Sequence, residues 1–309
     1  MKITAGIGSV DDYIKFVDAG ADELYCGYVP LAYMERYGST DPLNRREVMY
    51  YNVQMGSESE MDILADMIKD YGVPVTITLN SPYYSPERYE DIEKIAEGLI
   101  DKGFDTFIIA DPGLVMYLNQ NIKRNFRIHL SGETGEANSF MYDRIMNDHI
   151  SRIIFQRKTT ICDMQKIIKN NDAVEYEAFL LNEMCHFDGG YCNTFHCDEL
   201  APVCRLPYIY GNMIGKTDAV TDNENEIDAG YVTGSGGCGL CALWKLEKAG
   251  ITHLKIVSRG NYSDDTAEDI KSVKKALKFL KNSDTEEIYI SNMKKRLFEK
   301  DCSHNCYYL

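Results

Sequence analysis

Short apolar runs alternate with amphipathic stretches along most of the chain. Several of these runs are apolar at consecutive positions, which is typical of strands that are buried on both faces of a parallel sheet. The predicted strands cover residues 2–7, 22–27, 73–80, 105–110, 126–131, 151–156, 174–182 and 252–258. We therefore predict eight strands.

Helix signals fill the segments between these runs. Three segments, 9–20, 57–72 and 85–103, begin with serine and end with glycine, which are preferred helix caps, and the third has proline in its first turn. Further helices are predicted over 113–122, 134–147, 160–170 and 239–250. This alternation predicts an α/β fold, a regular or irregular TIM-like (β/α)8 barrel. A doubly wound open sheet competes with it, but no GxGxxG follows the first predicted strand.

One long connection, residues 183–238, interrupts the alternation of strands and helices between the seventh and eighth predicted strands. A connection of that length is usually functional or separately folded. We predict a barrel over residues 1–262, which includes a Cys-rich, cluster-binding insertion at 183–241. A helical C-terminal tail, 263–309, is expected to pack on the barrel.

The charge balance narrows the range of partners. The chain has 48 acidic against 33 basic residues and a formal net charge of −15, so we expect no nucleic acid partner. The N-terminal residues show no signal-peptide pattern, and no segment has the apolar length of a membrane span. We therefore expect a cytoplasmic protein without a membrane partner, in which disulfides are disfavoured.

Four cysteines, Cys185, Cys192, Cys197 and Cys204, stand within twenty residues, and a CxxC pair, Cys238 and Cys241, follows. Thiolates gathered so densely usually hold a metal or a cluster. The wide, irregular spacings favour a [4Fe–4S] cluster, while a closed zinc site more often shows two tight CxxC pairs. Zinc remains the alternative. His186 and His196 flank the run as possible substitute ligands, and Cys302 and Cys306 are either free or folded back onto the centre.

Several polar residues stand where predicted strands end, and in a barrel the catalytic groups lie at that face. The principal candidates are Asn80, Glu133, Arg157 and Arg259 at strand ends, and Lys255 inside the last predicted strand. Cys26, Tyr83, Asp111 and Ser131 occupy similar positions, although Asp111 before Pro-Gly is better explained as a helix cap.

A set of segments resembles, in order and spacing, the collagenase-like peptidase family U-32, which includes the oxygen-independent ubiquinone and RNA hydroxylases. The similarity covers most of residues 1–260. The segments are GADELYCG, TITLN, IIADPGL, RIHLSGETGEAN, IIFQRKTTICDMQKI, EAFLLNEMCHFDGGYC, VCRLPY and GLCALWKLEKAGITHLKIVSR.

The resemblance implies a TIM-like barrel and a [4Fe–4S] cluster. Position by position, it implies the ligands Cys185, Cys192, Cys204 and Cys241, with Cys197 as an alternative third ligand. Two departures stand out. Leu200 replaces the first cysteine of the family's CAQPC motif, and Val257 replaces the glutamate of KIEGR. If relatives use that glutamate as an acid or base, another group such as Glu133 must serve here.

These observations favour an iron–sulfur enzyme that carries out oxygen-independent hydroxylation, or a related modification, of a small molecule or peptide. Lys255, Arg259 and Arg157 would hold an anionic group, and Asn80, Tyr83 and Ser131 would orient the remainder. A peptidase, as the family name implies, is the alternative, although no HExxH or GxSxG is present. A non-catalytic cluster- or zinc-bearing partner subunit is a third hypothesis, since a homodimer or heterodimer is expected to be possible.

Overall fold

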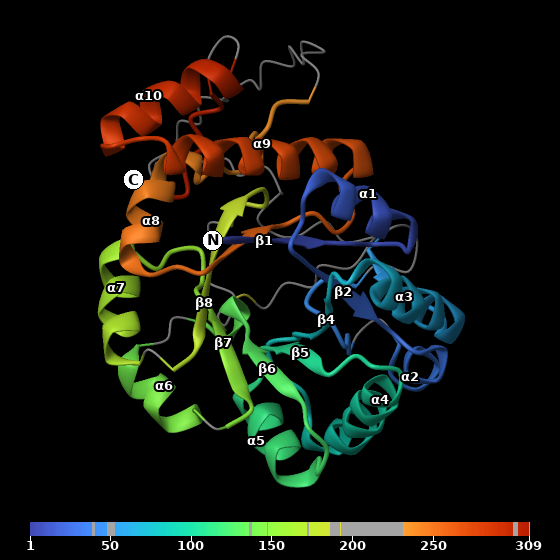
Figure 1. The fold of residues 1–309 in the computed structure, drawn as a ribbon. Coiled ribbons are helices and arrows are strands. Elements are labelled where there is room, and N and C mark those ends of the chain that lie inside the picture. Colours follow the sequence, from blue (N-terminus) through green and yellow to red (C-terminus); the bar gives the residue numbers. More distant parts are fainter. Residues whose placement is uncertain are drawn as a thin grey trace, which may run out of the picture.

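The computed structural model describes residues 1–38, 41–47, 53–135, 138–146, 148–171, 173–185, 192, 231–298 and 302–308. Eight parallel strands close into a barrel, because the last strand pairs with the first and the first pairs with the second (Figure 1). In ring order they are β1 (Lys2–Gly6), β2 (Glu23–Tyr28), β4 (Val75–Leu79), β5 (Thr106–Ile109), β6 (Arg127–Leu130), β7 (Ile150–Ile154), β8 (Glu175–Leu181) and β9 (His253–Ile256). The predicted TIM-like barrel and its eight strands are confirmed.

One short strand, β3 (Gln54–Met55), lies outside the ring and pairs with the end of β2. It was not predicted, because two residues carry no periodicity that a sequence pattern could reveal. The helix α2 (Leu31–Tyr37) was also not predicted. Most of its side chains are exposed or half-buried, so it lacks a strong apolar face.

Helices surround the ring and cover the outer faces of the strands (Figure 1). Between strands lie α1 (Asp11–Ala19), α3 (Glu58–Tyr71), α4 (Tyr89–Asp101), α5 (Pro112–Asn121), α6 (Ser139–Ile145), α7 (Ile161–Asn170) and α8 (Leu243–Ala249). Three short 3₁₀ turns precede helices: η1 (Pro86–Arg88), η2 (Gly132–Thr134) and η5 (Leu240–Ala242). None of the helices in the described ranges has the length and apolar character that crossing a membrane requires.

The predicted caps explain several helix boundaries. Ser57 accepts a hydrogen bond from the Glu60 amide while the Glu60 carboxylate accepts one from the Ser57 amide, which is a complete capping box. Gly72 ends the same helix at φ 73°, a left-handed conformation that glycine adopts without a Cβ clash. The helix predicted to begin at Ser9 begins two residues later, at Asp11.

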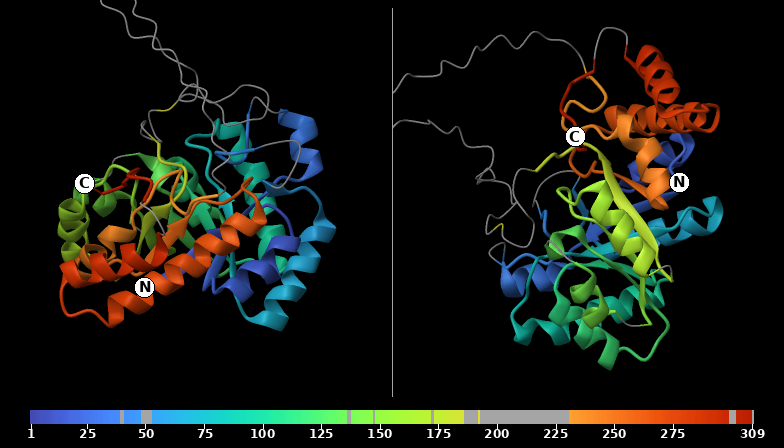
Figure 2. Two further views of the ribbon diagram at one scale, coloured as in Figure 1. Left: turned by 90° about the horizontal axis from the view of Figure 1, so that it is seen from above. Right: turned by 90° about the vertical axis from the view of Figure 1, so that its left-hand side faces the viewer.

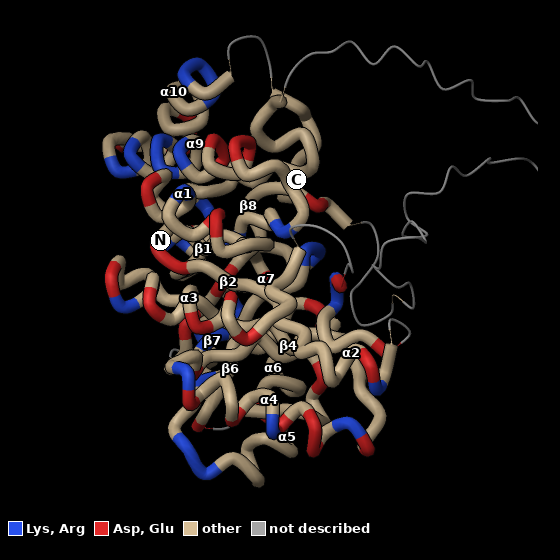
Figure 3. The backbone as a smooth tube through the Cα atoms, turned by 90° about the vertical axis from the view of Figure 1, so that its right-hand side faces the viewer, with Lys and Arg blue, Asp and Glu red and all other residues tan. Residues whose placement is uncertain are grey.

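The predicted C-terminal tail is only partly helical. Two helices, α9 (Ser263–Lys281) and α10 (Glu286–Leu297), pack along one side of the barrel, and α9 contacts α1 and β1 (Figure 2). Acidic residues occupy the first turn of α9 and basic residues its last, which complements the helix dipole (Figure 3). Beyond them, residues 302–308 are not helical and return to the barrel rim.

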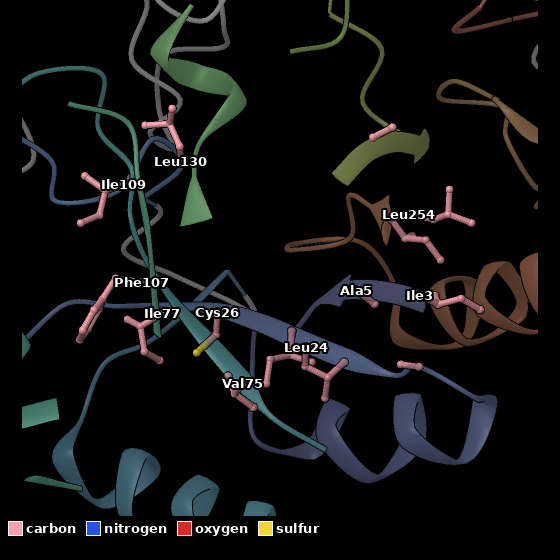
Figure 4. Close-up of a cluster of buried hydrophobic side chains, with 14 of the residues drawn as sticks. Ile3, Ala5, Leu24, Cys26, Val75, Ile77, Phe107, Ile109, Leu130 and Leu254 are labelled. Carbon is pink, nitrogen blue, oxygen red and sulfur yellow. The ribbon is translucent and has the colours of Figure 1, made fainter. Parts of the chain in front are cut away.

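The main apolar core lies between the strands and the helices. Figure 4 shows part of it, where Leu24, Ile77 and Phe107 come from three neighbouring strands and are fully buried. Residues that alternate with these point into the barrel. Because they are buried as well, the strands read as nearly continuous runs rather than as alternating patterns.

Candidate active site at the carboxyl end of the barrel

The middle of the barrel is charged rather than apolar. Arg152 on β7 forms ion pairs with Glu23 on β2 at 2.7 Å and with Glu177 on β8 at 2.9 Å. Lys255 on β9 lies 2.8 Å from the other oxygen of Glu177 and 3.9 Å from the centre of the Tyr25 ring. Burial alone would raise the pKa of Glu177, but Lys255 and Arg152 lower it to about 2. Glu177 is therefore a carboxylate shared by two buried cations.

An apolar layer covers this charged layer on the carboxyl side. Tyr25, Ile108, Ile154, Phe179 and Val257 form a buried cluster that is separate from the main core. Tyr307, from the end of the chain, packs against this cluster, and its hydroxyl donates to the carbonyl oxygen of Asn182. The chain end thus forms part of the barrel's mouth.

Arg259, which follows β9, occupies a narrow space made by two glycines. An added Cβ at Gly27 would lie 2.8 Å from its Nη1, and one at Gly6 would lie 2.9 Å from its Cγ. The guanidinium donates to the Thr78 hydroxyl at 3.2 Å. Burial lowers the pKa of Arg259, and within the described residues no carboxylate forms an ion pair with it. A buried cation of this kind suits an anionic ligand.

A second group of charges lies around Arg157, just after β7. Its Nη1 donates to Glu133 at 2.9 Å, its Nε donates to the carbonyl oxygen of Glu183 at 2.9 Å, and its Cζ lies 4.0 Å from the centre of the Phe179 ring. Burial alone would lower the pKa of Arg157, but Glu133 above all raises it. Arg157 is therefore a fixed cation that is already neutralised.

Asn80 is linked to the charged group around Arg157 through the backbone amide of Arg45. Its side-chain oxygen accepts from the amide of Arg45 at 3.1 Å, and Nε of Arg45 lies 3.4 Å from Glu133. Arg46, the next residue, forms an ion pair with Glu183. The loop that follows α2 thus brings two arginines to the barrel's carboxyl end.

All five principal candidates from the sequence lie at this end of the barrel. Only Arg157 and Glu133 touch each other directly; Lys255 lies deeper with Glu177, and Arg259 lies beside Thr78. Thr78, Arg45, Arg46, Glu183 and Tyr307 were not predicted. The adjacent arginines and the terminal tyrosine pair were visible in the sequence, but nothing local placed them at the mouth.

The remaining candidates have structural roles. Asp111 caps α5, since its carboxylate accepts from the Gly113 amide at 2.7 Å, and Ser131 accepts from the Glu133 amide at 3.1 Å. Cys26 is fully buried, and burial raises its thiol pKa to about 12. Tyr83, expected to orient a substrate, is 66% exposed, and its role stays a prediction.

Some of the cysteines lie in the described residues and others do not. Cys185 follows β8. The amide of the preceding Met184 donates to the Gly236 carbonyl at 2.7 Å, so Cys185 lies near the segment that carries Cys238 and Cys241. Cys197, Cys204, His186 and His196 lie outside the described residues. No disulfide joins any two of the described cysteines, and within the described ranges no three His, Cys, Asp or Glu side chains could hold a metal ion as they stand.

Comparison with known proteins finds similar sequences and similar structures. A curated relative, tRNA hydroxylation protein P from Haemophilus influenzae, is 26% identical over 173 residues, which are 56% of this chain and 34% of the relative. The chain therefore spans about a third of that protein's length.

Among solved structures, the U32 peptidase Mk0906 matches 58% of this chain and 68% of its own, at 15% identity and a TM-score of 0.44. N-acetylneuraminate lyase from Mycoplasma synoviae matches 94% of this chain and 78% of its own, at 7% identity and a TM-score of 0.48. The model of peptidase family U32 matches residues 8–308. The chain therefore belongs to peptidase family U32.

Proposed function

We propose that this chain is an iron–sulfur enzyme that carries out an oxygen-independent hydroxylation, or a related modification, of a small molecule or peptide at the barrel's carboxyl end. Its membership of family U32 and its similarity to a tRNA hydroxylation protein support this class of reaction. The observation that carries the proposal is the position of Arg259, a buried cation at the mouth, on the same rim as Cys185 and Cys241.

The proposed cofactor is a [4Fe–4S] cluster. By the family pattern its ligands are Cys185, Cys192, Cys204 and Cys241, with Cys197 as the alternative third ligand. The chemistry of the donors supports this choice, because thiolates are the ligands that such clusters take. When bound, the cluster would supply a redox-active iron beside the mouth.

The protein's own residues would bind and orient the substrate. Arg259 would hold an anionic group by charge-assisted hydrogen bonds, because its hydrogen-bond partner among the described residues is the neutral Thr78 hydroxyl. Lys255 and Arg157 were expected to share this task. Since each already pairs with a carboxylate, we assign them to positioning: Lys255 supports the Tyr25 ring, and Arg157 fixes Glu133.

Glu133 is the proposed acid or base, in place of the glutamate that Val257 replaces. Its carboxylate is held between Arg157 and Arg45, which fix its orientation. Asn80 positions Arg45 and thereby Glu133. The apolar layer around Phe179 would limit the access of water to the reacting groups.

The first test is metal analysis of protein purified without oxygen. Iron, sulfide and zinc are measured together with the visible spectrum, for the native chain and for Cys185→Ser and Cys192→Ser. We expect iron with equal sulfide and a broad visible absorption that both variants lose, while Cys162→Ser on α7 keeps it. A colourless native protein with stoichiometric zinc and no iron would overturn the proposal.

The second test concerns the substrate class. The family resemblance implies prephenate as the oxygen donor in some members, so prephenate is the probe for binding by calorimetry. Saturable binding that Arg259→Gln weakens, with Arg36→Gln as an exposed control, supports the anion role. Hydroxylation of added tRNA would contradict the small-molecule or peptide assignment. Cleavage of casein or collagen peptides by the metal-free chain would favour the peptidase alternative, and activity only with a second family member would favour a partner subunit.

A further inference from the structure

A short loop, residues 43–47, is held at the carboxyl end of the barrel by its own hydrogen bonds. The Glu47 carboxylate accepts from the amide of Leu43 at 2.8 Å and from the amide of Asn44 at 3.0 Å. The Tyr84 hydroxyl donates to the Leu43 carbonyl at 2.6 Å. The backbone at Asn44 is therefore fixed before any ligand binds, which lowers the entropic cost of binding.

The side chain of Asn44 is fully buried and only half satisfied. Its Oδ1 accepts from the Thr78 hydroxyl at 2.6 Å, a shorter contact than the 3.1 Å from that hydroxyl to the Cys26 carbonyl. The oxygen thus faces Thr78 and Nδ2 faces away from it. The Glu47 carboxyl lies near this amide, but Nδ2 forms no hydrogen bond with any group in the described part of the chain. A buried donor without an acceptor is costly, and a ligand oxygen would remove that cost.

Arg259 places a second donor beside this one. An added Cβ at Gly27 would lie 2.8 Å from Nη1 of Arg259 and 3.2 Å from Nδ2 of Asn44. Both nitrogens therefore lie close to one point next to Gly27, which a residue with a Cβ would occupy. Thr78 contacts both groups, because its hydroxyl also accepts from Nη1 of Arg259 at 3.2 Å. One charged donor and one neutral donor are thus held together.

The charges around these donors favour a singly charged ligand. Of the arginines described at this end of the barrel, Arg45, Arg46 and Arg157 form ion pairs with glutamates, whereas Arg259 does not. The buried Glu47 lies near enough to interact with Arg259 and would repel a dianion. A carboxylate carries one charge and two acceptor oxygens in a plane, which match one guanidinium and one amide. A phosphate monoester carries nearly two charges and three acceptor oxygens, and it needs more donors.

We propose that Asn44 and Arg259 together bind a carboxylate group of the substrate, and that Thr78 positions both donors. The proposal rests on the proposed function, since it names the class of anion that the substrate presents at the mouth. Asn44 would then determine specificity, because a substrate with a carboxamide in place of the carboxylate would bring an N–H group against a buried N–H donor.

The test uses the full chain, purified without oxygen and carrying isotope-labelled asparagine, with acetate, acetamide and inorganic phosphate as probes. The side-chain amide signal of Asn44 is identified in NMR spectra by its loss in Asn44→Leu. We expect acetate to shift this signal saturably, acetamide to leave it in place, and Arg259→Gln to abolish the shift. A signal that acetate does not move would overturn the site, and a shift at lower concentrations of phosphate than of acetate would overturn the carboxylate class.

The affinity for acetate, measured from its own NMR line width, tests the role of Asn44. Asn44→Leu should weaken binding by a factor of about ten or more, as expected for the loss of a hydrogen bond to a charged group. Asn121→Leu, at the exposed end of α5, should bind as the native chain does. If circular dichroism shows that Asn44→Leu does not fold, Asn44→Asp replaces it, because it keeps the size and places a carboxylate beside Arg259. Native affinity in the folded variant would exclude Asn44 from the site.

Iron analysis of the same preparations separates this proposal from the proposed function. Acetate binding that depends on Asn44 in a native protein without iron would support the carboxylate site and reject the iron–sulfur enzyme. A protein with a full complement of iron whose Asn44 signal ignores acetate would reject the carboxylate site and leave the iron–sulfur enzyme standing.

Discussion

The ammonium nitrogen of Lys255 lies 2.8 Å from a carboxylate oxygen of Glu177, inside the barrel and beneath the face of the Tyr25 ring. The second oxygen of Glu177 accepts from Arg152, which also pairs with Glu23, so one carboxylate contacts two buried cations. Glu175, two residues earlier on the same strand, also contacts Arg152, but its side chain is 44% exposed. The two glutamates provide a matched pair for measuring the effect of burial.

Glu177→Gln should lower the free energy of unfolding by about 3–5 kcal/mol, because it leaves the buried Lys255 without its counter-charge. Glu175→Gln should cost less than about 1 kcal/mol, since water screens the exposed partner. Urea denaturation of both variants measures the difference. Equal effects would show that the interior pair has no special role in stability.

The raised pKa of Glu47 should make the stability of the protein depend on pH. Burial raises its pKa to about 7, while hydrogen bonds from the amides of Asn44 and Leu43 oppose the rise. Because the folded state binds this proton more tightly than the unfolded state, the free energy of unfolding should fall as pH rises from about 4.5 to 7, by roughly 3 kcal/mol.

The measurement is urea denaturation of the native chain and Glu47→Gln across this pH range. Glu47→Gln should remove this part of the slope, and Glu35→Gln on the exposed side of α2 should keep it. A slope that is the same in all three proteins would show that Glu47 does not titrate in this range.

Gly27→Ala should disturb the proposed anion site without adding or removing a charge. The new Cβ would lie 2.8 Å from Nη1 of Arg259, so the guanidinium must move. Binding of prephenate, measured by calorimetry, should weaken by a factor of about ten or more, as expected for the loss of a charged hydrogen bond. Gly98→Ala on α4, where nothing lies within 4 Å of the added Cβ, should bind normally. Unchanged binding in Gly27→Ala would remove Arg259 from the site.

Tyr307 should contribute to stability mainly through its ring. Tyr307→Ala removes the ring from the apolar layer and should lower the free energy of unfolding by about 3 kcal/mol. Tyr307→Phe keeps the ring and loses the hydroxyl with its hydrogen bond to Asn182, at a cost of about 1 kcal/mol. Tyr83→Ala, at an exposed position, should lie within about 0.5 kcal/mol of the native chain. Thermal unfolding distinguishes the four proteins; a Tyr307→Ala variant as stable as Tyr83→Ala would mean that the tail is not docked.

Local patterns in the sequence were sufficient to predict the barrel. A strand buried on both faces must be apolar at consecutive positions, and a helix end must satisfy its free amides and carbonyls, so β4 and the capped helix α3 were both predictable. The same reasoning placed Arg157, Glu133 and Asn80 at strand ends and Lys255 inside the last strand. The short strand β3 and the helix α2 were not predicted, because neither has an extended apolar pattern.

The tertiary structure alone decided which residues meet. Closure of the ring brings Arg152 to Glu23, 129 residues away in sequence, and Lys255 to Glu177, 78 residues away. The returning tail brings Cys306 to Cys238 and Tyr307 to the mouth. Periodicity reports only which face of an element is buried, not which distant element covers that face. The sequence by itself therefore determined the elements and the supply of thiols and charges, whereas chain closure and the docked tail determined the pairs that they form.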